Sequence, residues 1–157
     1  AIVVATVFSL ALALNVPLGV IGAICPDEAP LLGLISLMAP AIAMGNTCVL
    51  IPSQTAPLAA TDFYQILETS DLPAGVVNIV TGDHSDLGKS LAGHMDVDAV
   101  WSFSSIPLSQ MIESQSVGNL KRTWVNNGRA SDWAQAEGRA FLRAATDVKT
   151  VWIPFGE

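Results

Sequence analysis

Short runs of apolar residues alternate along the chain with longer stretches whose apolar residues recur every three or four positions. The apolar runs at 20–24, 47–51, 76–80, 97–102 and 120–125 predict strands that are buried on both faces of a sheet. The stretches between them predict helices. Because such alternation is typical of right-handed crossovers, we expect an α/β fold: a doubly wound, mostly parallel sheet with helices on both faces.

Proline and glycine mark where the intervening helices begin and end. The stretch 31–44 is mostly apolar and stops at the Gly-Asn pair that follows it, with Pro40 expected to interrupt or bend the helix. Pro57 and Pro107 each open a further helix, and a short one ends near Gly93. The sequence therefore predicts one helix between each pair of strands.

The two ends of the chain are harder to assign. A last helix is expected at about 132–145 and a final strand at 148–153, which either closes a sheet edge or pairs with another domain or subunit. The apolar segment 1–14 is expected to be a helix that packs on the sheet or docks against a neighbouring domain. Residues 1–26 carry no charge, but Pro17 and Gly19 break a spanning helix, so we do not expect membrane insertion.

The amino-acid composition restricts the kinds of molecule that the chain is expected to bind. Of the 157 residues, 51% are hydrophobic and only 13% are charged, so part of the surface is expected to be covered by another domain or subunit. The net charge of −7 and the lack of a Lys/Arg cluster exclude nucleic-acid binding. The length suits one domain, 1–157, of a larger chain, and two cysteines without a disulfide pattern favour a cytoplasmic setting.

Three segments carry a resemblance to a known family. The segment 16–24 reads Val-Pro-Leu-Gly-Val-Ile-Gly-Ala-Ile, 39–50 contains Ala-Pro-Ala-Ile-Ala-Met-Gly-Asn-Thr, and 72–82 contains Leu-Pro-Ala-Gly-Val-Val-Asn. In this order they resemble the cofactor-binding part of aldehyde dehydrogenases. The pattern of losses described next is most similar to the C-terminal pseudo-domain of two-domain, family-16-type members.

The resemblance implies catalytic positions that hold other residues here. Glu28 stands where the family has the Asn that stabilises the oxyanion, and a carboxylate there would repel that charge. Asn126 stands at the general-base Glu and cannot accept a proton at neutral pH. The family's nucleophilic Cys lies downstream of that position, whereas no Cys follows Cys48 in this chain. We therefore expect no catalytic residue in it.

The coenzyme-binding positions implied by the resemblance are also altered. Ile51 and Gln54 replace the Lys and Glu that hold the ribose, so that only Gln54 could still donate or accept a hydrogen bond. Phe103 and Leu108 replace two glycines that let backbone N–H groups approach the diphosphate, and a bulky ring is expected in its path. Ser104 keeps its hydroxyl, with a helix N-cap as its favoured role. We expect no cofactor, and NAD or NADP only if an alternative binding mode exists.

The other polar residues have simpler interpretations. Cys25 and Cys48 are expected to be buried apolar residues, and the acidic pair Asp27 and Glu28 to complement the dipole of the following helix. The two histidines, His84 and His94, are expected on solvent-facing loops, with too few neighbours for a metal site. The four Trp residues are either core or contact surface: Trp101, Trp124, Trp133 and Trp152.

Three functions remain open at this stage. The first is a non-catalytic structural or assembly domain of a larger aldehyde dehydrogenase protein, whose partner is another dehydrogenase domain or subunit in a homo-oligomer. The second is an NAD(P)-binding fragment of an active aldehyde oxidoreductase whose catalytic residues lie elsewhere. The third is an α/β module that binds another small ligand at the carboxyl edge of the sheet.

Overall fold

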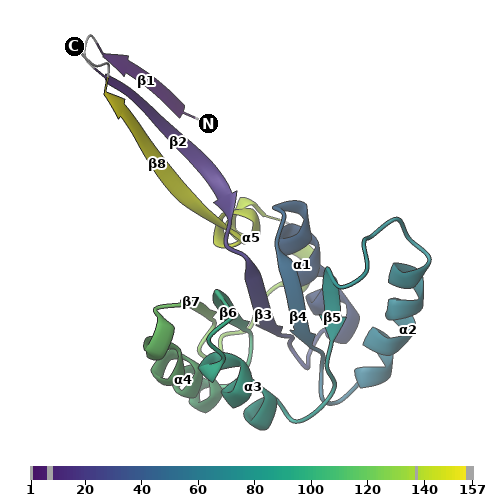
Figure 1. The fold of residues 1–157 in the computed structure, drawn as a ribbon. Coiled ribbons are helices and arrows are strands. Elements are labelled where there is room, and N and C mark those ends of the chain that lie inside the picture. The colour runs from purple at the N-terminus through teal and green to yellow at the C-terminus, as the bar shows by residue number, and fades with distance from the viewer. Residues whose placement is uncertain (1, 7–8, 137, 155–157) are drawn as a thin grey trace.

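Five parallel strands form the central sheet of the body, and a narrower arm projects from it (Figure 1). The computed structural model describes residues 2–6, 9–136 and 138–154. The strand order is β5-β4-β3-β6-β7, so the chain runs outward from β3 in both directions. This confirms the doubly wound α/β fold. The bounds are β3 Val20–Ile24, β4 Thr47–Ile51, β5 Val77–Ile79, β6 Ala99–Ser102 and β7 Arg122–Val125.

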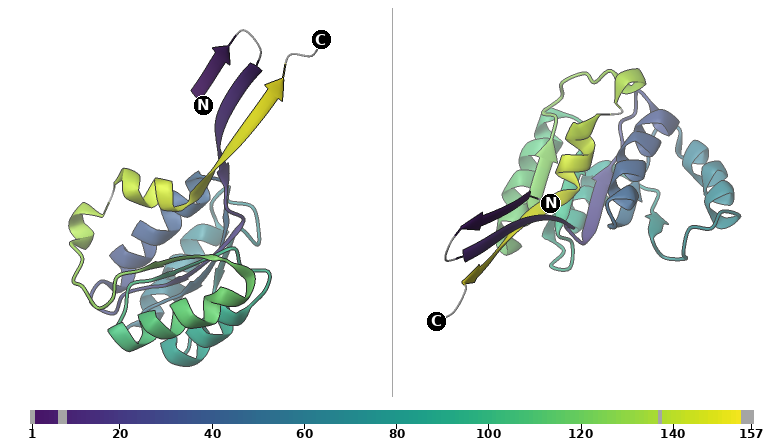
Figure 2. Two further views of the ribbon diagram at one scale, coloured as in Figure 1. Left: turned by 90° about the vertical axis from the view of Figure 1, so that its left-hand side faces the viewer. Right: turned by 90° about the horizontal axis from the view of Figure 1, so that it is seen from above.

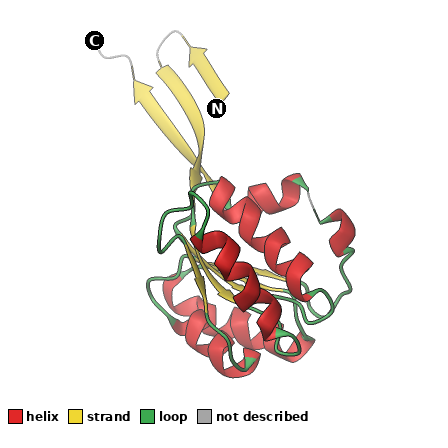
Figure 3. Ribbon diagram, turned by 90° about the vertical axis from the view of Figure 1, so that its right-hand side faces the viewer, coloured by secondary structure: helices red, strands yellow, loops and turns green. Residues whose placement is uncertain are grey.

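Helices cover both faces of this sheet (Figure 3). Buried side chains place α1, α2 and α5 on one face and α3 and α4 on the other. Pro40 lies inside α1 without ending it, so the expected interruption there is wrong. The bounds are α1 Pro30–Ala43, α2 Pro57–Glu68, α3 His84–Gly93, α4 Ile106–Gln115, η1 Ser116–Asn119, η2 Trp133–Gln135 and α5 Arg139–Ala144.

Alternate residues of β3 point to the two helical layers. Ile21 and Ala23 pack in the cluster formed with α1, whereas Ile24 packs with α3 and α4. Gly22 lies under Leu91 of α3, where a Cβ atom would come within 2.4 Å of the leucine Cδ2. A glycine is needed there because the helix and the strand approach so closely.

The arm is a three-stranded antiparallel sheet that stands away from the body (Figures 1 and 2). It consists of β1 Ile2–Thr6, β2 Ser9–Pro17 and β8 Thr146–Pro154, with β2 in the middle. The helix expected at 1–14 is therefore wrong for the described residues of that segment. Each residue of β2 pairs with one of β8, as in Leu12 with Val151, and this pairing outweighs the helix propensity of the alanines. The strand expected at 148–153 is confirmed within β8.

The segment before β8 is less regular than expected. In place of one helix at 132–145, the structure has the short η2, an extended Gly138 and the six-residue α5. Tertiary contacts explain this: Trp133 is buried and hydrogen-bonded near the body's sheet, which fixes the path of the chain there. No helix in the described residues is long and apolar enough to cross a membrane.

Candidate functional site

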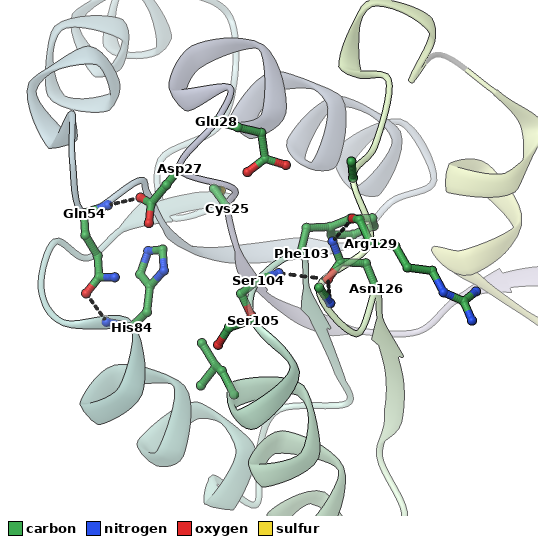
Figure 4. A pocket seen from close by; sticks show the side chains of 13 residues that line it. Cys25, Asp27, Glu28, Gln54, His84, Phe103, Ser104, Ser105, Asn126 and Arg129 are labelled. Carbon is green, nitrogen blue, oxygen red and sulfur yellow. Dashed lines mark hydrogen bonds between the residues drawn. The ribbon is translucent and has the colours of Figure 1, made fainter.

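A crevice of about 510 Å³ lies at the carboxyl edge of the parallel sheet, where the loops after β3 and β6 diverge (Figure 4). The chain leaves β3 toward α1 on one face of the sheet and leaves the neighbouring parallel strand β6 toward α4 on the other face. Open α/β sheets bind ligands at such a switch point. Residues from the loops after four strands and from the start of α3 meet here. The lining includes Cys25, Asp27, Glu28, Gln54, His84, Phe103, Ser104, Ser105, Leu108, Asn126 and Arg129.

Glu28 is tied to the C-terminal segment of the chain. Its Oε1 accepts a 3.0 Å hydrogen bond from Nε1 of Trp133, an indole that is only 5% exposed. Helix α1 begins at Pro30 with no acidic residue in its first turn, so the expected role of Glu28 at the helix dipole is wrong. Glu28 instead satisfies a buried donor that is 105 positions distant.

Asp27 organises the turn that follows β4. Its Oδ1 accepts hydrogen bonds from Ser53 Oγ at 2.7 Å and from the backbone N–H groups of Gln54 at 2.8 Å and Thr55 at 3.4 Å. Burial acts to raise the pKa of Asp27, but these hydrogen bonds and nearby His84 outweigh it and hold the pKa below its usual value. Asp27 is therefore a carboxylate at neutral pH.

His84 lies at the first position of α3 and is 4% exposed, so its expected place on a solvent-facing loop is wrong. Its Nε2 is 2.7 Å from the carbonyl oxygen of Pro52, and its backbone N–H donates to Oε1 of Gln54. Gln54, at the ribose-contact position, thus already has an internal partner. His94 is exposed at the C-terminus of α3, as expected.

Phe103 is part of an aromatic cluster behind the crevice. Its ring centroid lies 5.1 Å from those of Trp124 and Trp133, and 6.2 Å from that of Phe141. The residue is 6% exposed while contributing to the crevice lining. Trp101 and Trp133 are thus core residues and Trp124 is half-buried against them, whereas Trp152 in the arm is 70% exposed.

The turn after β6 is closed by Asn126. Its Oδ1 accepts from the backbone N–H groups of Ser104 and Gly128, and its Nδ2 donates to the carbonyl of Arg129 (Figure 4). Ser105, not Ser104, is the residue before α4, and its side chain makes no capping bond. Ser104 Oγ instead lies 2.6 Å from Ser102 Oγ, so the expected N-cap is wrong.

The remaining altered positions are apolar and packed. Ile51 is 2% exposed at the end of β4, and Leu108 is half-buried in α4 against the same apolar cluster.

Burial raises the pKa of Cys25 and of Cys48 to about 12, and both are fully buried as expected. Across the described ranges, no group of three or more His, Cys, Asp or Glu residues is arranged to hold a metal ion.

The structure brings most of the residues singled out in the sequence to one place. The residues that line the crevice are Glu28, Gln54, Phe103, Ser104, Leu108 and Asn126. Ile51 does not line it and is buried in the core. Sequence reasoning missed the part played by His84 and Trp133. His84 follows the predicted strand at 76–80 and could have been placed at the same sheet edge, but no local signal brings Trp133 there.

Comparisons with known proteins agree with this architecture. Residues 4–137 match the aldehyde dehydrogenase family. The NADP/NAD-dependent aldehyde dehydrogenase PuuC of Escherichia coli is 37% identical over 123 residues, which cover 78% of this chain and 25% of PuuC. Human aldehyde dehydrogenase 1A1 is 37% identical over 116 residues, covering 73% of this chain and 23% of its own length.

Solved structures match over the same region. Indole-3-acetaldehyde dehydrogenase in complex with NAD⁺ has a TM-score of 0.74 at 37% identity, with 78% of this chain and 25% of that one covered. PnpE from Pseudomonas sp. WBC-3 has a TM-score of 0.75 at 33% identity, with 78% and 26% covered. The chain thus spans about a quarter of the length of the relatives it matches. On this match of sequence and fold, the chain belongs to the aldehyde dehydrogenase family.

Proposed function

We propose that this chain is a non-catalytic assembly domain of a larger aldehyde dehydrogenase protein, of the family-16 type. The observation that carries the proposal is the arm, which stands clear of the body and exposes Leu14, Val148, Trp152 and Ile153 (Figure 2). A narrow sheet with exposed apolar residues and open edge strands is a template for pairing with another chain. The partner is another dehydrogenase domain or subunit.

The lining of the crevice supports the loss of catalysis. Glu28 and Asn126, at the oxyanion and general-base positions, are both engaged in internal hydrogen bonds. The side chain of Glu28 has no N–H to donate to an oxyanion, and the amide of Asn126 cannot accept a proton from a substrate at neutral pH. The lining also contains two carboxylates against a single cation, Arg129, and this negative balance does not suit the diphosphate of a dinucleotide.

The test compares the size of the assemblies formed by an arm variant and by a matched control variant. Replacing Trp152 and Ile153 by Ser removes apolar surface while leaving the backbone pairing with β2 intact. Light scattering after gel filtration of the full-length parent protein is expected to show smaller assemblies for this variant. A matched control replaces the exposed Leu58 and Ile66 of α2 by Ser and is expected to leave assembly unchanged. Unchanged assembly of the arm variant would contradict the proposal.

The presence of the crevice favours a second candidate function, that of an NAD(P)-binding fragment. A cavity of about 510 Å³ at the switch point is where a nicotinamide coenzyme would bind in an NAD(P)-binding fragment. Calorimetric titration of NAD and NADP into the chain separates the two functions. Saturable binding at micromolar coenzyme would favour the oxidoreductase fragment over the assembly domain.

A further inference from the structure

We propose that Asn127 is a site of spontaneous deamidation, and that Asn126 controls the rate of this reaction by holding the turn at 126–129 closed. Asn127 is followed by Gly128, and this is the only Asn-Gly pair in the chain. The proposal is independent of the assembly function, because residues of this turn line the crevice and no described residue of the arm does.

Deamidation at an Asn-Gly pair proceeds through a cyclic succinimide. The backbone nitrogen of Gly128 loses its proton and attacks Cγ of Asn127, and the side-chain amide nitrogen leaves as ammonia. Water then opens the ring and gives either aspartate or isoaspartate. Glycine favours the first step because it has no Cβ atom to obstruct the approach of its nitrogen. The reaction therefore needs no enzyme and no co-reactant besides water.

The turn that carries the pair is open to water. Asn127 is exposed, and its side chain has no hydrogen-bond partner among the described residues. Asn127 and Gly128 are both left-handed, with φ of 51° and 71°, and the N–H of Arg129 donates to the carbonyl oxygen of Asn126 at 3.1 Å. Two left-handed central residues are typical of a type I′ turn, which Asn-Gly favours. The amide that would leave is thus accessible.

The nitrogen that would attack is held by the fold. The N–H of Gly128 donates to the carbonyl oxygen of Ser104 at 3.0 Å and lies 3.3 Å from Oδ1 of Asn126, which also accepts it. While these bonds persist, the nitrogen keeps its proton and its position in the turn. The turn must therefore open before the succinimide can form.

Asn126 is the side chain that ties the turn to the loop after β6. Its Oδ1 also accepts from the backbone N–H of Ser104 at 3.0 Å, and its Nδ2 donates to the carbonyl oxygen of Arg129 at 2.8 Å (Figure 4). An exposed turn opens locally more often than a buried strand, and each hydrogen bond that is lost makes opening more frequent. Asn126 is therefore the positioning residue that sets the rate.

The product would alter the wall of the crevice. Aspartate at 127 adds a negative charge beside a lining that already contains Asp27 and Glu28. Isoaspartate also inserts a carbon atom into the backbone before Gly128, which does not fit the short connection from Asn126 to Arg129. Deamidation thus converts a transient opening of the turn into a permanent change.

The test incubates the chain at neutral pH, folded in buffer and unfolded in guanidinium chloride. Tryptic cleavage then releases residues 123–129, and mass spectrometry of this peptide measures the conversion of Asn127 to aspartate or isoaspartate. Asn126→Ala removes all the side-chain bonds, whereas Asn126→Asp keeps the acceptor and loses only the donation to Arg129. The matched control is Asn78→Ala, which removes an exposed amide that donates to carbonyls elsewhere in the body.

Asn127 should react roughly tenfold or more slowly in the folded wild type and the folded control than in guanidinium chloride. Folded Asn126→Ala should react roughly threefold or more faster than the folded wild type, with Asn126→Asp between them. All four proteins should react alike when unfolded. Circular dichroism verifies folding, and if Asn126→Ala loses the wild-type spectrum the comparison uses Asn126→Asp.

Several outcomes would overturn the proposal. Folding that does not slow the reaction would remove the protective role of the turn. Folded Asn126 variants that react as slowly as the wild type, or an Asn78→Ala variant that accelerates as much as Asn126→Ala, would remove the role of Asn126. Absence of conversion in the unfolded chain would show that Asn127 is not a deamidation site.

Discussion

Asn46 donates a 2.9 Å hydrogen bond from Nδ2 to the carbonyl oxygen of Ala145, which lies 99 positions further along the chain. The same amide donates to Ala41 at the end of α1, and its Oδ1 accepts from the backbone N–H of Gly19. Asn46 is 3% exposed, so these three bonds replace solvation. One side chain thus fixes the start of β3, the end of α1 and the base of the arm.

Replacing Asn46 by Ala should destabilise the protein by roughly 1–3 kcal/mol, because buried backbone groups lose their partners. Urea unfolding followed by circular dichroism measures this loss. Asn78→Ala is the matched control, since Asn78 also donates to two carbonyls but is exposed, and a smaller loss is expected there. Equal losses for the two variants would contradict the role of Asn46 as a buried junction.

Glu28→Ala should also lower stability, by roughly 1–3 kcal/mol, because the buried indole N–H of Trp133 loses its acceptor. Glu28→Gln keeps an acceptor and should cost less. Urea unfolding monitored by tryptophan fluorescence compares the two variants. If both lost the same amount of stability, the charge of Glu28 would matter more than its hydrogen bond.

Asp27 should contribute to the acid sensitivity of the fold. Its pKa is lowered in the folded protein, so its stabilising contribution is present above its unfolded pKa of about 4 and is lost as the pH falls through the folded value. Asp27→Asn should therefore unfold with a weaker dependence on pH below about 4. Urea midpoints measured across this range test it, with Asp62→Asn expected to follow the wild type.

Phe103→Ala should destabilise the protein by roughly 3–5 kcal/mol, because the ring packs between Trp124 and Trp133 and its removal leaves a cavity. Phe103→Leu fills more of that space and should cost less. Thermal or urea unfolding measures both changes. A Phe103→Ala variant as stable as the wild type would place the ring outside the core.

Both thiols should be unreactive in the folded state. Burial raises the pKa of Cys25 and Cys48 to about 12, so neither forms a thiolate at pH 8. An aromatic disulfide reagent is expected to label neither thiol in the native protein and both in urea. Rapid labelling of one native thiol would show that its strand opens to solvent.

Local pattern was enough to predict the body of the molecule. The five parallel strands are short apolar runs because both faces of the sheet are covered, and prolines mark the first turns of α1, α2 and α4. The altered site positions could also be placed at one edge, because residues that follow parallel strands meet there. These features depend on neighbours close in sequence.

Only the tertiary structure decided the arm, the burial of His84 and the position of Trp133. Residues 10–14 alternate Leu with Ala, so both faces look apolar and the two-residue period of a strand is hidden. Their pairing with β8 depends on a segment more than 130 residues away. Hydrogen bonds such as Glu28 to Trp133 likewise form between distant positions, so their energy has no trace in a local sequence pattern.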